Sequence, residues 1–206
     1  EETLQMVRDT VKELVGHGKV PVCMGGEHTI TMGVLRGIGR TPLLVFDAHL
    51  DLRESLMGLK LCHASWLRYS IEAGLVEKAL VVGARGFCKE EVEYASNRVK
   101  YVTPIDLREG GGKEAFASFV EGAGKLYVSV DVDAFDPAYA PGVGNPEPDG
   151  LSASELFSLL EAVRSSGLVG FDVVEVSPPY DLGATSSLAA KTLFELISLS
   201  ERNSRA

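Results

Sequence analysis

The stretch L-L-V-F-D-A-H-L-D at residues 43–51 joins an apolar run to three residues of metal-binding type. The apolar run, 43–46, has the length and character of a buried strand. The stretch L-Y-V-S-V-D-V-D at residues 126–133 repeats this arrangement, with a second apolar run that ends in two aspartates. Two buried strands that end in carboxylates indicate a sheet whose strand ends carry the polar chemistry of the protein.

Along the rest of the chain, apolar runs alternate with amphipathic helical stripes. Strands are predicted at residues 20–24, 43–46, 79–83, 99–102, 126–130 and 169–176. Helices are predicted at residues 1–16, 28–38, 63–73, 89–96, 112–121, 152–165 and 185–199, and a Pro/Gly-rich loop at 136–150. Strands that alternate with helices predict an α/β fold with right-handed crossovers and a parallel sheet covered on both faces.

The composition excludes several classes of protein. The chain has 206 residues, a formal net charge of -9 and 45% apolar residues, which is ordinary usage for one soluble globular domain. The acidic balance argues against a nucleic-acid partner and a membrane-surface role, and no apolar run approaches the ~18 residues of a transmembrane helix. The cysteines Cys23, Cys62 and Cys88 are odd in number and widely spaced, which favours a reducing, cytoplasmic location.

Six side chains of metal-binding type follow three of the predicted strands. They are His28, Asp47, His49, Asp51, Asp131 and Asp133. Because side chains two apart in extended chain share one face, three neighbouring strands would aim these groups at one place. Four unpaired carboxylates would repel one another, and two divalent cations would cancel their charge. Oxygen and imidazole ligands without thiolates favour Mn²⁺, and a metal pair can make hydroxide from water at neutral pH.

Four stretches, taken together, resemble the ureohydrolase family of arginases and agmatinases. They are G-G-E-H-T at 25–29, F-D-A-H-L-D at 46–51, S-V-D-V-D-A-F-D-P at 129–137 and V-V-E-V-S-P-P-Y-D at 173–181. The resemblance implies a three-layer α/β/α sandwich around a mostly parallel sheet, as a single domain over residues 1–206. Family members usually carry several tens of residues ahead of the first helix, so we expect an N-terminal segment to be lacking. The resemblance also implies two Mn²⁺ per subunit and a homotrimer or homohexamer.

The same resemblance assigns the six residues to two metal sites that share bridging aspartates. One Mn²⁺ would be bound by His28, Asp47, Asp51 and Asp131. The other would be bound by Asp47, His49, Asp131 and Asp133. Asp51 would also orient a metal-bridging hydroxide, Glu175 would bind the substrate guanidinium, and His63 would carry a proton to the leaving amine. Trp66, the only tryptophan, is expected to serve in packing.

The implied substrate is a small guanidino compound. Positions that grip the α-amino-acid end of the substrate in arginases carry Arg53, Leu59 and Leu61 here, and Gly86-Phe87-Cys88 follows Arg85 where arginases have acidic residues. An apolar wall of this kind suits a decarboxylated substrate. We therefore expect agmatine to be hydrolysed to putrescine and urea, with arginine a poor substrate. Arg53 keeps guanidinobutyrate open, because its guanidinium could pair with a carboxylate.

Three other functions stay open. An arginase, guanidinobutyrase or formimidoylglutamase would keep the mechanism and change the substrate. A single-zinc deacetylase on a similar scaffold would need one metal, which would leave His28 and Asp133 without a role. A non-catalytic relative would bind only metal or a polyamine. Dinucleotide binding is disfavoured, because no G-x-G-x-x-G follows the first strand.

Overall fold

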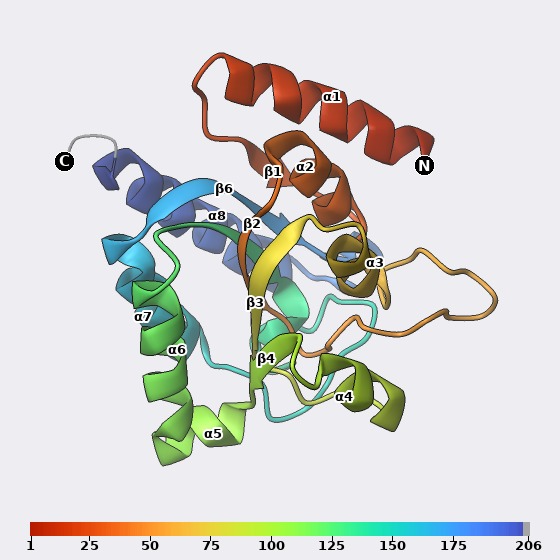
Figure 1. Cartoon of the computed structure of the whole chain (residues 1–206). Coiled ribbons are helices and arrows are strands. Elements are labelled where there is room, and N and C mark those ends of the chain that lie inside the picture. The colour runs from red at the N-terminus through yellow and green to blue at the C-terminus, as the bar shows by residue number, and fades with distance from the viewer. Residues whose placement is uncertain (204–206) are drawn as a thin grey trace.

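A six-stranded sheet forms the middle layer of the protein in the computed structural model, which describes residues 1–203, with side chains up to Glu201 (Figure 1). All pairings are parallel, and the strand order is β1-β6-β5-β2-β3-β4. The strands are β1 (Val22–Met24), β2 (Thr41–Phe46), β3 (Val76–Val82), β4 (Val99–Val102), β5 (Lys125–Asp131) and β6 (Gly167–Val174). Each of the six predicted strands is present.

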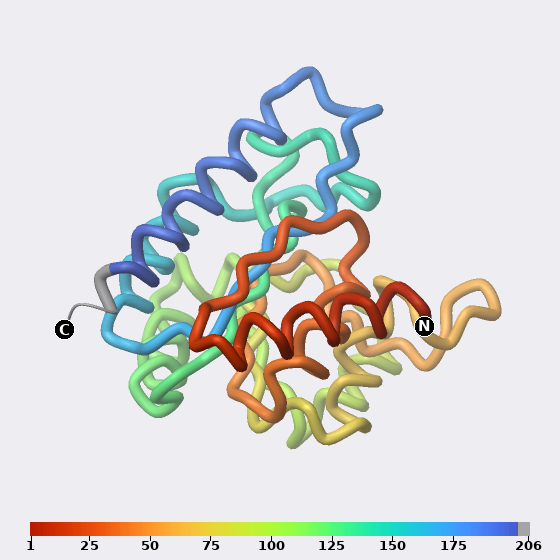
Figure 2. Tube along the Cα trace, turned by 90° about the horizontal axis from the view of Figure 1, so that it is seen from above, coloured from red at the N-terminus to blue at the C-terminus, as the bar shows by residue number. Residues whose placement is uncertain are grey.

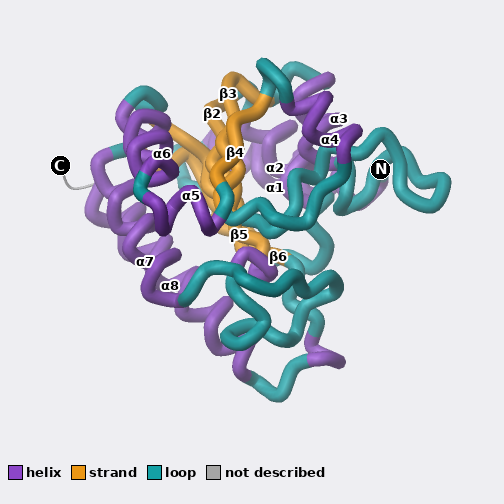
Figure 3. The backbone as a smooth tube through the Cα atoms, turned by 90° about the horizontal axis from the view of Figure 1, so that it is seen from below, coloured by secondary structure: helices purple, strands orange, loops and turns teal. Residues whose placement is uncertain are grey.

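Helices cover both faces of the sheet, as Figure 3 shows with the strands between two groups of helices. One face carries α1 (Glu2–Gly16), α2 (Ile30–Ile38), α3 (Trp66–Glu72) and α4 (Lys89–Ala95). The other carries α5 (Pro104–Glu109), α6 (Gly111–Glu121), α7 (Ala153–Ala162) and α8 (Ala184–Asn203). In β2, Leu43 and Val45 pack in the first core and Leu44 and Phe46 in the second, as strand alternation requires. The predicted α/β/α sandwich is confirmed.

Several helical segments differ from their predictions, and the helix predicted at 28–38 begins only at Ile30, after His28. Helix α5 was not predicted, because its six residues are too few to show an amphipathic stripe; Thr103 and Asp106 cap its first turn reciprocally. The helix predicted at 152–165 ends as a 3₁₀ turn, Val163–Ser165. The helix predicted at 63–73 begins only at Trp66, which leaves His63 in a loop. Within residues 1–203, no helix has both the length and the apolar content needed to cross a membrane.

The strand order decides which side chains meet at the carboxyl end of the sheet. Strands β2 and β5 are neighbours, with Phe46 paired to Val130, so the next residues, Asp47 and Asp131, lie side by side. Strand β1 is not their neighbour, because β6 lies between β1 and β5. The expectation of three neighbouring strands is therefore wrong. The loop after β1 instead crosses the end of β6, where the Glu175 N–H bonds the Gly26 carbonyl at 2.7 Å.

The segment between β2 and α3 projects from the body of the protein as a hairpin, in orange in Figures 1 and 2. Leu56 and Leu59 pair through two backbone hydrogen bonds of 2.9 Å. The two residues between them, Met57 and Gly58, have positive φ angles of 50° and 82°, as a two-residue hairpin turn requires. The Met57 side chain at the tip is 96% exposed. The hairpin forms one rim of the cavity described below.

Candidate metal centre

The segment from Asp47 to Asp51 leaves β2 through a turn at Asp47, whose Oδ1 accepts the His49 N–H at 2.6 Å. His49 then forms an isolated parallel bridge with Gly86, so the chain is extended there. Asp51 departs from the extended chain that the sequence argument assumed, because its backbone is left-handed, with φ of 53°. Asp51 Oδ2 also accepts a 2.7 Å hydrogen bond from Trp66 Nε1, so Trp66 is more than a packing residue.

A second turn holds Asp131 and Asp133. Strand β5 ends on Asp131, and the chain passes at once into a 3₁₀ turn, Val132–Ala134, so the argument from extended chain fails here too. Asp131 Oδ1 accepts the Asp133 N–H at 2.8 Å, and Asp133 Oδ1 accepts the Ala48 N–H at 3.0 Å. These bonds fix one oxygen of each carboxylate and tie the ends of β2 and β5 together.

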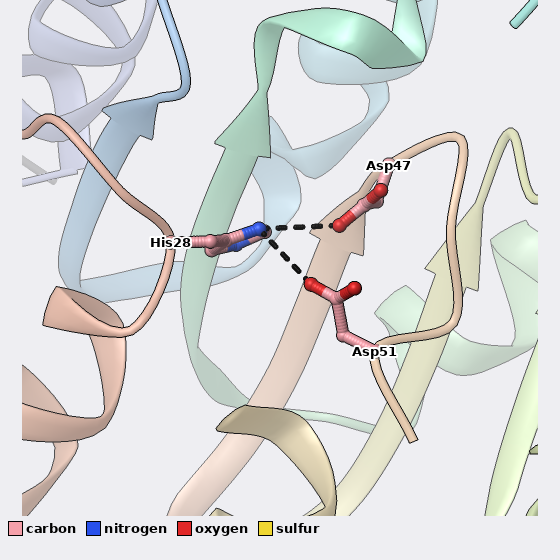
Figure 4. A group of neighbouring side chains, drawn as sticks. All are labelled: His28, Asp47 and Asp51. Carbon is pink, nitrogen blue, oxygen red and sulfur yellow. Dashed lines mark ion pairs between the residues drawn. The ribbon is translucent and has the colours of Figure 1, made fainter. Parts of the chain in front are cut away.

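His28 points into the space between these two turns, as Figure 4 shows for Asp47 and Asp51. Its Nδ1 atom lies 3.2 Å from Asp47 Oδ2, 3.4 Å from Asp51 Oδ2 and 3.2 Å from Asp131 Oδ2. The histidine is fully buried, and Nδ1 has no hydrogen bond of acceptable geometry within the described residues. We call these four residues the inner group.

The other nitrogen of His28, Nε2, contacts a buried hydrogen-bond network on the side away from the carboxylates. Nε2 lies 2.9 Å from Ser129 Oγ, which donates to Asp172 Oδ1 at 2.6 Å. Thr31 and Tyr127 donate to the other Asp172 oxygen, so this buried carboxylate is fully engaged. Sequence reasoning missed Ser129 and Asp172; the signal was a polar residue inside an otherwise apolar strand. The network fixes the ring so that Nδ1 faces the carboxylates.

A second group forms around His49. Its Nδ1 atom lies 3.0 Å from Asp133 Oδ2 and 3.5 Å from Asp47 Oδ1. The His49 side chain is 23% exposed, and Nε2 lies 3.9 Å from Glu147 Oε1. We call Asp47, His49 and Asp133 the outer group. Asp47 belongs to both groups, because Oδ2 faces His28 and Oδ1 faces His49.

The charges in this cluster shift its pKa values. Burial, then the Asp47 charge, raises the pKa of Asp51 well above its usual range, and burial with the Asp133 charge does the same for Asp131. Burial alone would lower the pKa of His49, but contacts with Asp133 and Asp47 outweigh it and raise that pKa to about 12. In the metal-free cluster, Asp51, Asp131 and His49 therefore bind protons more tightly than the same groups in water, whereas contacts with His28 and His49 outweigh burial and lower the pKa of Asp47.

The donor set fits divalent cations. Two sets of three groups each place ligand atoms within 4.8 Å of one another: His28, Asp47 and Asp51, and Asp47, His49 and Asp133. A buried Nδ1 without a hydrogen bond, surrounded by three carboxylate oxygens, lacks the partner that buried polar atoms normally have. A cation bound to these atoms would supply it. Oxygen and imidazole donors are compatible with Mn²⁺.

The two remaining predicted residues, Glu175 and His63, face the same cavity as the cluster. Glu175 follows β6 in a left-handed conformation (φ 68°) and accepts the His28 N–H at 2.7 Å. Burial raises its pKa, against the effect of that hydrogen bond. His63 Nδ1 lies 3.5 Å from Glu27 Oε1, and this contact, larger in effect than burial, raises the pKa of His63. Sequence reasoning missed Glu27 as the partner of His63.

The cavity has a volume of about 540 Å³ and opens above the cluster. Besides the groups already described, its wall includes Arg53, Leu56, Met57, Phe87, Cys88, Glu91, Asn145 and Glu147. The predicted wall of Leu59 and Leu61 is wrong, because neither lines the cavity and Leu59 is 63% exposed. From the hairpin, the half-buried Leu56 lines the cavity instead, with the exposed Met57 at its outer edge. Phe87 and Cys88 line the cavity as predicted.

Arg85 joins the 136–150 loop to the strand ends. Its guanidinium donates to the carbonyls of Glu147 at 2.7 Å and Pro148 at 3.0 Å. It also donates to the Asp133 carbonyl at 2.9 Å and the Gly83 carbonyl at 3.0 Å. This positioning role was not predicted. It brings the side chains of Asn145 and Glu147 to the cavity rim.

Comparison with known proteins agrees with this geometry. The Arginase family model matches residues 1–198. The chain belongs to the arginase family. Among its relatives is a guanidinobutyrase of Pseudomonas aeruginosa, 33% identical over 208 residues, or 95% of this chain and 65% of that protein. The mitochondrial guanidino acid hydrolase of Homo sapiens is 34% identical over 96% of this chain and 59% of that protein.

A solved structure supports the fold directly. The agmatine ureohydrolase of Thermoplasma volcanium is 36% identical, with a TM-score of 0.90 over 100% of this chain and 70% of that chain. The family resemblance inferred from the motifs is confirmed. This arginase-family chain spans less than two thirds of the length of the two curated relatives named above.

Proposed function

We propose that this chain hydrolyses the guanidinium group of agmatine to putrescine and urea, with two Mn²⁺ held by the inner and outer groups. The observation that carries the proposal is the orientation of Asp47, which turns one carboxylate oxygen to each histidine. A shared carboxylate is what two adjacent cations need. Two bound divalent cations would lower the pKa of water held there and so supply a nucleophile near neutral pH.

Glu175 binds and orients the substrate. Its carboxylate lines the cavity beside the cluster, fixed by the His28 N–H. A carboxylate accepts paired N–H bonds from a planar guanidinium and holds the central carbon over the inner and outer groups. The cationic substrate also favours the ionised form of Glu175, which burial disfavours in the free protein.

His63 delivers a proton to the leaving nitrogen. Contact with Glu27 raises the pKa of His63, so the protonated ring is available near neutral pH. Glu27 engages Nδ1, which leaves Nε2 for the substrate. The water oxygen bonds to the guanidinium carbon, the bond from that carbon to the substituted nitrogen breaks, and the two water protons end on that nitrogen as R–NH₃⁺. Urea is the other product.

The Glu147 carboxylate at the cavity rim suits a cationic tail, because its own contact is a weak one, 3.9 Å from His49 Nε2. If two divalent cations balance the four aspartates and Glu175 binds the guanidinium, the remaining charged wall groups are Glu91 and Glu147 against Arg53, Arg85 and a protonated His63. Arg85 is already engaged by backbone carbonyls. Agmatine carries an ammonium at the end opposite its guanidinium, and the apolar parts of the wall suit its methylene chain.

A guanidino acid is the second candidate, and Arg53 is the observation that favours it. Its side chain lines the cavity and is 40% exposed, and its one ion pair among the described residues is a 3.6 Å contact with Glu91. A substrate carboxylate could pair with this guanidinium in place of that contact. The guanidinobutyrase of Pseudomonas aeruginosa, by its name, acts on such a substrate.

Urea release from Mn²⁺-loaded protein tests the proposal, with agmatine, arginine and 4-guanidinobutyrate compared side by side. We expect rapid release from agmatine, slow release from arginine, and loss of activity in Asp131→Ala. Release from 4-guanidinobutyrate alone would establish the second candidate. No urea from any of the three, with Mn²⁺ bound, would refute hydrolysis by this chain.

A further inference from the structure

Trp66 is the only tryptophan of the chain and lies against the inner group. It is the first residue of α3 and is fully buried. Its Nε1 donates to Asp51 Oδ2 at 2.7 Å, and its ring centroid lies 4.5 Å from that of His28, with the planes tilted by 32°. One side chain thus touches two of the four residues of the inner group.

The hydrogen bond of Trp66 has a specific consequence for Asp51. A buried indole N–H needs an acceptor, and here the acceptor is the carboxylate oxygen that also lies 3.4 Å from His28 Nδ1. The bond uses one lone pair of Oδ2 and fixes the direction of the rest of the carboxylate. Without it, Asp51 could rotate away from His28.

The backbone of Asp51 makes this support more important. Asp51 has a φ of 53°, a conformation that L residues rarely adopt. Helix α3 holds it through two bonds: Trp66 Nε1 to the side chain, and the Arg68 N–H to the Asp51 carbonyl at 3.3 Å. The hydrogen bond and the ring contact of Trp66 both go to the inner group, whereas His49 and Asp133 are held by other contacts.

We infer that Trp66 is a positioning residue for the inner cation site, where it holds the Asp51 carboxylate and the His28 ring in ligand orientation. The inference rests on the proposed function, since it requires that the inner group binds a divalent cation. It goes further in two respects. The two cations depend on different supports, and the fluorescence of Trp66 reports the filling of the inner site.

Trp66→Phe tests whether the two cation sites depend on different supporting residues, because it keeps an aromatic ring against His28 and removes the N–H donor to Asp51. Mn²⁺ binding is measured by titration calorimetry and chelator competition on the whole chain. We expect one of the two Mn²⁺ to bind about 10- to 100-fold more weakly, the usual cost of losing a partner that orients a metal ligand, while the other keeps its affinity. In the wild-type protein, we expect the tryptophan emission to change with the same binding step.

Phe116→Leu is the matched control. Phe116 is a buried aromatic of α6 in the core on the opposite face of the sheet. The variant should lower the melting temperature and leave both Mn²⁺ affinities unchanged.

Unchanged affinities in Trp66→Phe, or equal weakening of both cations, would overturn the inference and leave the proposed function intact. If Trp66→Phe does not fold, the wild-type emission still decides: no change on Mn²⁺ loading would overturn the inference. Failure of the wild-type protein to bind Mn²⁺ would overturn the proposed function itself.

Discussion

The inner and outer groups of the cluster share Asp47 but differ in how they are held. His28 of the inner group is fully buried, backed by Ser129, and in contact with Trp66. His49 of the outer group is 23% exposed and faces the cavity, with Glu147 3.9 Å away. The two groups therefore have similar ligands in different environments. Core packing surrounds the inner group, whereas loops surround the outer group.

This difference separates two tasks. A site enclosed by packed side chains keeps its geometry whether or not a substrate is present. A site at the edge of a cavity can admit water and substrate, at the expense of weaker support from its surroundings. We therefore expect mutations near the inner group to change metal binding and stability, and those near the outer group to change metal binding and turnover. The predictions below test this contrast, beginning with the residue that belongs to both groups.

Asp47→Ala should affect the inner and outer groups alike, because it removes a carboxylate from both. We expect loss of both Mn²⁺ and a fall in urea release on the order of 10³-fold or more, since the activated water depends on the cations. Metal content and urea release are measured on the same sample. Asp9→Ala, an exposed aspartate of α1, is the control and should change neither. Retention of two cations in Asp47→Ala would contradict the role of Asp47.

Parallel substitutions of the two histidines should sharpen the contrast. His28→Ala leaves a cavity and buried carboxylates without a partner, so we expect it to lower the free energy of unfolding by about 2–4 kcal/mol. His49→Ala also leaves Asp47 and Asp133 without a partner, but its position is partly exposed and the cavity left behind is open to water, so we expect a smaller cost than for His28→Ala. Each variant should lose one cation. Denaturant unfolding of the metal-free proteins measures both costs, and equal costs would show that the two environments are equivalent.

Removing the hydroxyl that contacts His28 Nε2 should have a smaller effect on metal binding. Ser129→Ala removes the link between His28 Nε2 and Asp172, and we expect about 10-fold weaker binding of one Mn²⁺. Ser70→Ala is a matched control, because Ser70 is also buried and its hydroxyl has no hydrogen-bond partner within the described residues. Chelator competition compares the two variants. Equal affinities in both would mean that the Ser129 contact contributes nothing to metal binding.

The fold and the site differed in how far the sequence could predict them. The strands and their buried character follow from local apolar runs such as 43–46, so all six were found. The position of β6 between β1 and β5 is a long-range property that no local pattern encodes. The prediction that the strand before His28 neighbours the other two ligand-bearing strands was therefore wrong. Helix α5 was missed because its six residues show capping but no stripe.

Within the site, residue types were more informative than geometry. The six predicted ligands converge, but through turns at Asp51 and Asp133 rather than through extended chain. The predicted cavity wall was partly wrong: Leu56 lines the cavity, whereas Leu59 is exposed beyond the hairpin turn and Leu61 packs against the core. The role of Trp66 depends on a contact across 15 residues that composition could not reveal.

The smallest predicted effect concerns pH. The raised pKa values of Asp51 and Asp131 mean that the metal-free fold gains stability from protonated carboxylates below pH 3.8 and loses it as pH rises above that value. The His49 contribution is present below pH 6.5 and is lost between pH 6.5 and about 12. Asp47, whose pKa is lowered, acts in the opposite sense below pH 3.8.

Mn²⁺ requires deprotonated ligands, so the stabilisation of the fold by Mn²⁺ should grow as pH rises and the ligands lose their protons. The melting temperatures with and without Mn²⁺ should therefore move apart from pH 5 to pH 8. The expected shift is about 2–4 °C for each kcal/mol that Mn²⁺ adds to the free energy of unfolding. A constant difference across this range would contradict the assignment of these groups as ligands.

The number of Mn²⁺ bound per chain tests the central claim most directly. Elemental analysis of protein equilibrated with saturating Mn²⁺, normalised to protein concentration, gives this number without any assumption about the substrate. The inner and outer groups predict two ions per chain. A single ion would contradict the paired centre and favour a one-metal hydrolase on a similar scaffold.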